Sequence, residues 1–193
     1  SPFFIGLIDD RFFAAEKIMG VLHIAGGLVL YYVSDLTTAG SIIFGLLIYN
    51  ACYMPTLALA NTISFNQMTS PDTQFPKVRI WGTIGWIVAG LVISYGLAAS
   101  YNNIETTAIP MKMAAIASLV MGLFSFTLPK TPAQNTGKKT TIGDILGLDA
   151  LALMKDRSFA IFALCSLLIS IPLAFYYAFA NLYFNELGME NVA

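Results

Sequence analysis

Five long apolar segments, separated by short polar links, limit what this chain of 193 residues can fold into. A helix that crosses the hydrocarbon core of a bilayer needs about 20 mostly apolar residues. In lipid, every backbone N–H and C=O must be satisfied within the segment, and no segment alternates as a barrel strand does. The sequence therefore predicts an all-α integral membrane protein. The full segments cover residues 18–34, 39–65, 80–99, 108–128 and 158–183, and residues 2–8 read as the end of another whose beginning is missing, so we expect a fragment.

The composition agrees with a membrane protein. Hydrophobic residues make up 57% of the chain and charged residues 11%, whereas a soluble domain has about 25% charged residues. A net charge of −1 gives no attraction to nucleic acid. Cys52 and Cys165 lie in apolar segments without metal-ligand spacing, and we expect two buried free thiols. No metal site and no cofactor are expected.

The basic residues predict an orientation in the membrane, because Lys and Arg gather in cytoplasmic loops. Nine of the ten fall in alternate links, at residues 9–17, 66–79 and 129–157, and only Lys112 does not. These three links are therefore predicted to be cytoplasmic in a multi-pass protein of the cell (inner) membrane. The links near 35–38 and 100–107 are predicted to lie outside.

The link at 129–157 is long enough to divide the chain. Residues 1–128 read as one helical half that lacks its first helix and part of its second, and residues 158–193 as the first helix of the other half. Within the link, residues 141–152 carry a weak apolar stripe that predicts a short amphipathic helix on the cytoplasmic face. The alternative is that these residues simply begin the next spanning helix.

Several motifs resemble those of a known family. Gly6, Asp10 and Arg11 fit the pattern Gly-x-x-x-Asp-Arg, which resembles the loop between the second and third helices of the major facilitator superfamily. Phe13 departs from that pattern, which has glycine there, and alanines replace its basic pair. Three further stretches, YMPTLALANTIS, FPKVRIWGTIGWI and LGLDALALMKDRSFAIF, are similar to the nucleoside:proton symporter branch. The resemblance covers the whole chain.

The resemblance implies a major facilitator-type helical bundle, of which this chain holds the end of helix two through helix seven. It implies a secondary active transporter that imports nucleosides by proton symport with alternating access. Its expected partners are the nucleoside, protons, the lipid bilayer and the remaining helices of the same transporter. The alternative is a transporter of a sugar or another small polar solute. The resemblance also implies that Gly6, Asp10 and Arg11 form a gating loop, although a solvated turn would look the same.

Arg79 directly precedes the third apolar segment, residues 80–99. Pro76 is expected to start this helix, so from the pattern alone Arg79 is a flanking residue that reaches lipid phosphates. Arg79, Thr83 and Trp86 nevertheless follow i, i+4, i+7 spacing and project from one stripe. The resemblance implies that this stripe lines the substrate cavity. A guanidinium, a hydroxyl and an indole can there bind the polar edge and the face of a nucleobase.

Other polar residues are further candidates for substrate binding. Asn61, with its neighbours Ser64 and Asn66, either reaches the cavity or hydrogen-bonds neighbouring helices. Tyr177 and Asn181 share one face of the last helix, which Pro172 is expected to kink, and they contact either substrate or other aromatic groups. Some family members have amide groups near residues 174 and 177, so their substrate preference is not transferred to this chain.

The remaining features have simpler explanations. Gly82, Gly85 and Ala89 are expected to let helices approach closely. His23 reads as a packed, hydrogen-bonded residue rather than a proton relay, and no proposed helix has a carboxylate at its middle. The proton-coupling group is therefore expected in the missing half or is not a simple buried acid. Neither an intramembrane enzyme nor a membrane scaffold or receptor has supporting chemistry here, and we predict that the protein is not an enzyme.

Overall fold

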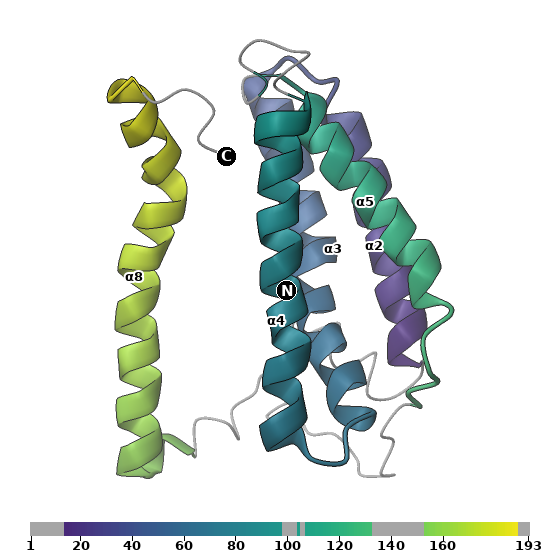
Figure 1. Cartoon of the computed structure of the whole chain (residues 1–193), viewed down its shortest axis with the longest axis vertical. Coiled ribbons are helices and arrows are strands. Elements are labelled where there is room, and N and C mark those ends of the chain that lie inside the picture. The colour runs from purple at the N-terminus through teal and green to yellow at the C-terminus, as the bar shows by residue number, and fades with distance from the viewer. Residues whose placement is uncertain (1–13, 98–103, 105–106, 133–152, 189–193) are drawn as a thin grey trace.

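The computed structural model describes residues 14–97, 104, 107–132 and 153–188, and over these ranges it is helical without a strand (Figure 1). The prediction of an all-α fold is confirmed. The helices are α2 (Ala15–Val33), α3 (Ala39–Asn66), α4 (Pro71–Leu91), α5 (Ile109–Ser125) and α8 (Arg157–Glu186). A π-helix, η1 (Val92–Leu97), continues α4, and a 3-10 turn, η3 (Leu153–Lys155), precedes α8.

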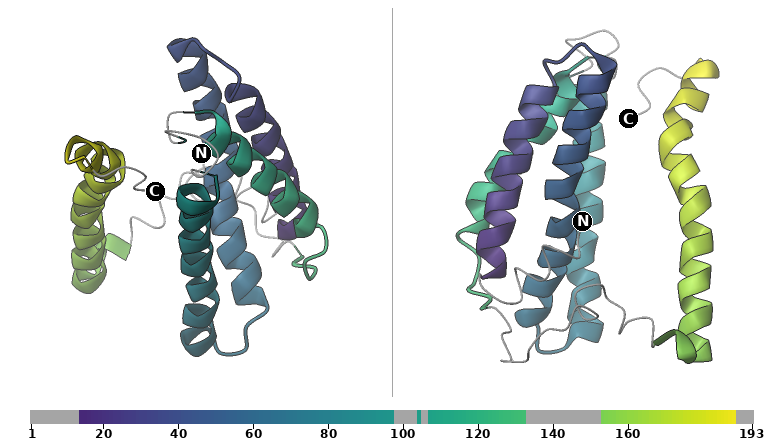
Figure 2. Two further views of the ribbon diagram at one scale, coloured as in Figure 1. Left: turned by 45° about the horizontal axis from the view of Figure 1, so that its top comes forward. Right: turned by 180° about the vertical axis from the view of Figure 1, so that it is seen from behind.

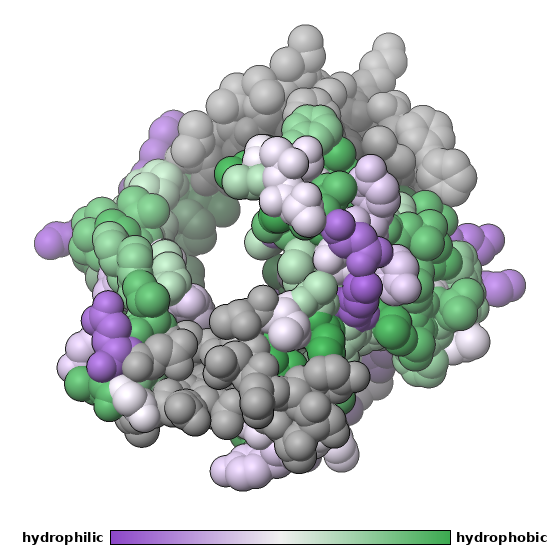
Figure 3. All heavy atoms as spheres, turned by 90° about the horizontal axis from the view of Figure 1, so that it is seen from above, coloured by the Kyte–Doolittle hydropathy of each residue, from purple (hydrophilic) through white to green (hydrophobic). Residues whose placement is uncertain are grey.

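Four of these helical stretches are long and apolar enough to cross a membrane: α2, α3, α4 with η1, and most of α8. The fifth, α5, is apolar but has 17 residues. Apolar side chains cover the outside of the described helices, as the green surfaces in Figure 3 show. In water such surfaces would be unfavourable, whereas lipid or further helices can cover them.

The predicted start of the third spanning helix was wrong. Helix α4 begins at Pro71, so Pro76 lies inside it and only residues 67–70 remain as a link. Pro71 occupies the first turn, where a missing N–H costs nothing. The Gln74 side-chain oxygen accepts hydrogen bonds from the N–H groups of Thr69 and Ser70, each at 3.1 Å, which fixes this end of the helix.

Helices α2, α3 and α5 form a packed group (Figures 1 and 2). Glycines let α2 and α5 approach closely: a Cβ built on Gly122 of α5 would lie 3.0 Å from the carbonyl oxygen of Gly20 on α2. At Gly27 of α2 it would lie 3.0 Å from the carbonyl oxygen of Ala115 on α5. Such backbone approach is how membrane helices gain packing contacts where lipid supplies no hydrophobic driving force.

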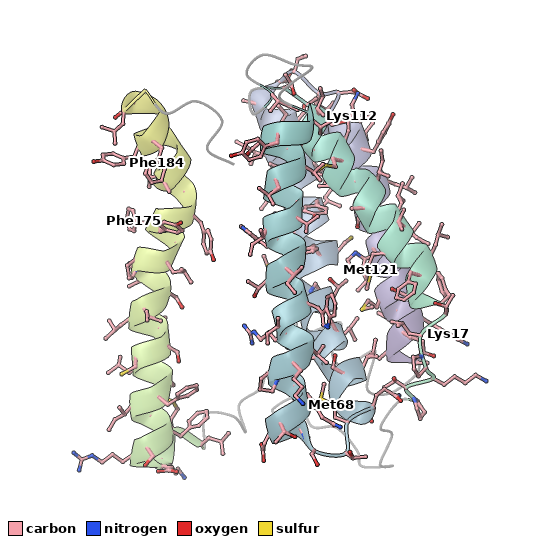
Figure 4. The ribbon with its side chains drawn as sticks, in the orientation of Figure 1. Lys17, Met68, Lys112, Met121, Phe175 and Phe184 are labelled. Carbon is pink, nitrogen blue, oxygen red and sulfur yellow. The ribbon has the colours of Figure 1, made fainter. Side chains whose placement is uncertain are left out.

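Polar contacts tie the packed group together at both ends. At one end Lys112 of α5 forms an ion pair of 2.7 Å with Asp35, which follows α2. At the opposite end, where Figure 4 places Lys17, the Thr131 N–H donates to the buried carboxylate of Glu16 at 3.0 Å. The Ala15 N–H returns a bond of 3.2 Å to the Thr131 carbonyl oxygen. The start of the long predicted link is thus bound to the first turn of α2.

Helix α8 stands apart from the packed group, on the far side of α4 (Figure 1). Viewed along the helices, an opening lies between α8 and the other described helices (Figure 3). Helix α8 continues through Pro172, and its axis bends in its second half, as the kink prediction requires (Figure 1). The two cysteines are free but not both buried as predicted, because Cys52 is half-buried and Cys165, on α8, is exposed.

Some predictions lie outside the described residues. These are the partial helix at 2–8, the gating loop with Gly6, Asp10 and Arg11, and the amphipathic helix at 141–152. The division into 1–128, 129–157 and 158–193 also stays a prediction. It is compatible with the end of α5 at Ser125 and the start of α8 at Arg157.

Candidate solute-binding site

Arg79, Thr83 and Trp86 project from one stripe of α4, because all three lie within its regular α-helical part. Arg79 is the ninth residue of the helix, which begins at Pro71. It is therefore two turns inside the helix rather than next to its start, and the main argument for a simple flanking residue is lost. All three side chains are exposed, Trp86 to 72%.

A contact between two aromatic rings shows which way this stripe faces. The centroids of the Trp86 and Tyr177 rings lie 6.1 Å apart at an interplanar angle of 50°. These rings, called here the aromatic pair, join α4 to α8. The centroid of Tyr176 lies 5.5 Å from that of Tyr177, so a third ring borders the pair. The structure thus brings together two residues that the sequence singled out separately, and it turns the α4 stripe towards α8.

The polar groups of the stripe are not used within the described structure. Hydroxyls elsewhere bond to the helix's own carbonyls, as Thr56 does to Tyr53 at 2.7 Å and Ser64 to Ala60 at 2.7 Å. In the described part of the chain, neither the Thr83 hydroxyl nor the Arg79 guanidinium has a hydrogen bond or ion pair. A guanidinium carries five N–H donors and a hydroxyl both donates and accepts. This face of α4 can therefore bind a solute that presents several acceptors.

Asn61, on α3, stays a prediction as a substrate-binding residue. Asn61 is exposed and lies on the side of α3 opposite Leu59, which packs on α2 in the core cluster. Ser64 and Asn66 bond carbonyls of their own helix, at 2.7 and 3.0 Å. Neither of the two roles considered for that pair is therefore seen. Asn181 lies in α8, four residues after Tyr177, but its side chain is outside the described part.

His23 is packed and hydrogen-bonded, as predicted. Its Nδ1 lies 3.1 Å from the hydroxyl of Ser118 on α5, and that hydroxyl donates to the His23 carbonyl oxygen at 3.0 Å. Because the Ser118 proton is used in the second bond, Nδ1–H is the donor in the first. The ring also meets Tyr53 edge-on, with centroids 6.3 Å apart. Ser118 was not predicted as the partner, although a serine in the middle of an apolar helix signals such a bond.

The prediction of close helix packing at Gly82 and Gly85 is not met among the residues that the structure describes. A Cβ built at either position would have no neighbouring atom within 4 Å. Glycines that do pack closely include Gly20 and Gly27 of α2, Gly122 of α5, and Gly45 of α3, which lies against Val33. No group of His, Cys, Asp or Glu that could hold a metal ion occurs within the described ranges.

The fold is that of part of an all-helical membrane transporter. A crystal structure of a mutant of the nucleoside transporter NupG matches with a TM-score of 0.78 and 33% identity, over 94% of this chain and 45% of that one. A second crystal structure of NupG matches with a TM-score of 0.72 and 32% identity, over 96% and 46%. The chain belongs to the nucleoside H+ symporter family, whose sequence model matches residues 1–192.

Relatives in Escherichia coli K12 are transporters and permeases rather than enzymes. The putative nucleoside transporter YegT is 45% identical over 99% of this chain and 45% of its own length. The nucleoside permease NupG is 32% identical over 98% and 45%, and the xanthosine permease 30% over 96% and 44%. The chain therefore spans less than half the length of the curated relatives it matches.

Proposed function

We propose that this chain is part of a secondary active transporter that imports nucleosides by proton symport with alternating access. The observation that carries the proposal is the aromatic pair, because it turns the stripe of Arg79, Thr83 and Trp86 towards α8. Membership of the nucleoside H+ symporter family supports a nucleoside as solute and a proton as the coupled ion.

The chemistry of the stripe fits a neutral, partly aromatic solute. The guanidinium of Arg79 can donate forked hydrogen bonds to base carbonyls, and the Thr83 hydroxyl can bond a second polar atom. The rings of Trp86 and Tyr177 can stack on the face of a base. An apolar site with a few placed polar groups is the usual design for binding such a solute. Asn61 and Asn181 stay in the proposal as further substrate-binding residues, and Gly6, Asp10 and Arg11 as its gating loop.

We propose that the protein lies in the inner membrane of the cell. The helix ends that carry Lys17, Lys77 and Arg157 then face the cytoplasm. Of the three predicted cytoplasmic links, 9–17 loses the residues from Ala15 onward to α2, and 66–79 shrinks to 67–70. The ion pair with Asp35 explains the one exception, since it neutralises Lys112 at the opposite end.

The test is uptake of labelled uridine and adenosine into membrane vesicles that contain the full-length transporter. Uptake should collapse when an uncoupler removes the proton gradient. Arg79→Ala should lower kcat/KM at least tenfold, because a charged donor to the solute is lost, and such bonds contribute about 1.5–3 kcal/mol. Uptake that survives both the uncoupler and the substitution would remove the proposal.

Lys77→Ala is the matched control. Lys77 is exposed, carries the same charge on the same helix and lies two residues before Arg79, on another face. It should leave uptake unchanged. Equal losses in both variants would mean that only positive charge near this membrane surface matters. Competition by free bases and by sugars distinguishes a nucleoside from another small polar solute.

A further inference from the structure

The aromatic pair fixes which residues of α8 lie level with Arg79. Helices α4 and α8 run in the same direction (Figure 1) and meet at the aromatic pair, and α8 stays α-helical through Pro172, which lies between Ser170 and Tyr177. Seven residues before Trp86 is Arg79, and seven residues before Tyr177 is Ser170. Seven residues are nearly two helical turns and about 10 Å of rise, so each residue lies on the face of its aromatic partner. Ser170 is therefore placed across from Arg79.

A second serine extends this face of α8. Ser166 lies one turn before Ser170, and the Ser170 hydroxyl donates to the Ser166 carbonyl oxygen at 2.7 Å. Ser170 is exposed and Ser166 half-buried. A membrane helix often satisfies a hydroxyl in this way without any further role. Here, however, the bond also decides what the hydroxyl can offer, because its single proton is used.

The face of α4 with Arg79 and the face of α8 with Ser170 are chemically complementary. The Arg79 guanidinium can only donate hydrogen bonds, whereas the Ser170 oxygen, with its proton committed, keeps lone pairs that accept one. A solute held by Arg79 through its acceptors still has to satisfy its own donors once water is removed. Leaving a donor unpaired would cost more than the bond itself contributes. An acceptor on the opposite helix meets this requirement.

We propose that Ser170 is a specificity-determining residue of the solute site, where its oxygen accepts a hydrogen bond from a sugar hydroxyl of the nucleoside. This proposal rests on the proposed function. It adds Ser170 of α8 to the site and names the part of the solute, a sugar hydroxyl, that Ser170 binds. Arg79 and Thr83 bind the acceptors of the solute, the aromatic pair covers the base, and Ser170 selects solutes that keep the hydroxyl.

The test compares uptake of uridine, 2′-deoxyuridine and 3′-deoxyuridine by the full-length transporter and its Ser170→Ala variant. For uridine, Ser170→Ala should raise KM about three- to tenfold with little change in kcat, which corresponds to one hydrogen bond. For the analogue that lacks the bonded hydroxyl, the wild type should already show the raised KM, and the substitution should add nothing. Ser170→Thr, which keeps a hydroxyl, should restore most of the uridine affinity.

Ser158→Ala is the control, because Ser158 lies on the same helix on another face. A merely structural role for Ser170 would raise KM equally for all three solutes or lower the melting temperature instead, and either result overturns the proposal. So does an unchanged KM for uridine. If Arg79→Ala abolishes uptake while Ser170→Ala changes nothing, only this inference fails. If the wild type takes up no nucleoside, both proposals fail.

Discussion

Buried polar side chains of the α2–α3–α5 group find partners on the protein itself, whereas Arg79 and Thr83 of the α4 stripe find none among the described residues. His23 and Ser118 satisfy each other across α2 and α5, and Glu16 accepts the Thr131 N–H at the start of α2. Arg79 and Thr83, on a helix that is also long and apolar enough to cross a membrane, have no such partner among the described residues.

The difference separates two uses of polarity in a membrane protein. A polar group that holds helices together is satisfied by its neighbours, because an unsatisfied group in hydrocarbon costs several kcal/mol. A polar group left open on a helix is tolerated where it faces water, a cavity or a solute. Substitutions in the packed group should therefore change stability, and those on the α4 face should change transport.

The largest expected effect tests whether close helix packing stabilises the α2–α3–α5 group. Gly122→Leu should destabilise the protein by about 3 kcal/mol, because even a Cβ would lie 2.7 Å from Ile24 and 3.0 Å from the Gly20 carbonyl. Gly82→Leu is the control, since a Cβ there meets nothing within 4 Å. Thermal melting of the full-length protein in detergent measures both. Equal destabilisation would show that Gly82 packs against a part of the transporter outside the described residues.

The next effect concerns the buried carboxylate of Glu16, which is 3% exposed. Glu16→Ala leaves the N–H of the buried residue Thr131 without its acceptor, which costs about 1–3 kcal/mol. Glu16→Gln keeps a side-chain oxygen in place and should lose much less. Melting temperatures of the two variants distinguish them. If alanine and glutamine behave alike, the charge rather than the hydrogen bond holds this end of the packed group.

The long apolar segments were enough to predict the helices, because lipid leaves the backbone few alternatives. The end of α4 nearest Arg79 was mispredicted, since Pro71 and Pro76 both suit a first turn and the choice depends on how Gln74 folds back onto Ser70. The stripe of Arg79, Thr83 and Trp86 was predictable from helical spacing alone.

What the stripe faces was not predictable from the residues. Trp86 and Tyr177 lie far apart in the sequence, and no local pattern pairs them. Ser170 carried no signal until that contact fixed the register between α4 and α8. The close approach at Gly20, Gly27 and Gly122 was not predicted for the same reason. Small residues indicate that something can approach, but only the packing of α2 on α5 shows where it does.

A smaller effect distinguishes the two readings of His23. His23→Gln should lower stability by about 1 kcal/mol through the altered bond to Ser118. If the residue only packs, the dependence of uptake on external pH should match that of the wild type. Ser41→Ala, at an exposed position near the start of α3, is the control and should change neither stability nor the pH profile. A shifted pH profile in His23→Gln would mean that this residue takes part in transport rather than only in packing.

The smallest expected effect is at the ion pair of Lys112 and Asp35, whose side chains are 37% and 60% exposed. Exposed pairs contribute little, because water and salt screen them and two side chains lose freedom. Asp35→Asn should lower the melting temperature slightly at low ionic strength, and 1 M salt should remove the difference. A large loss that persists in salt would mean that this pair, like Glu16 with Thr131, is a structural tie of the packed group. The satisfied polar contacts would then hold both of its ends with similar strength.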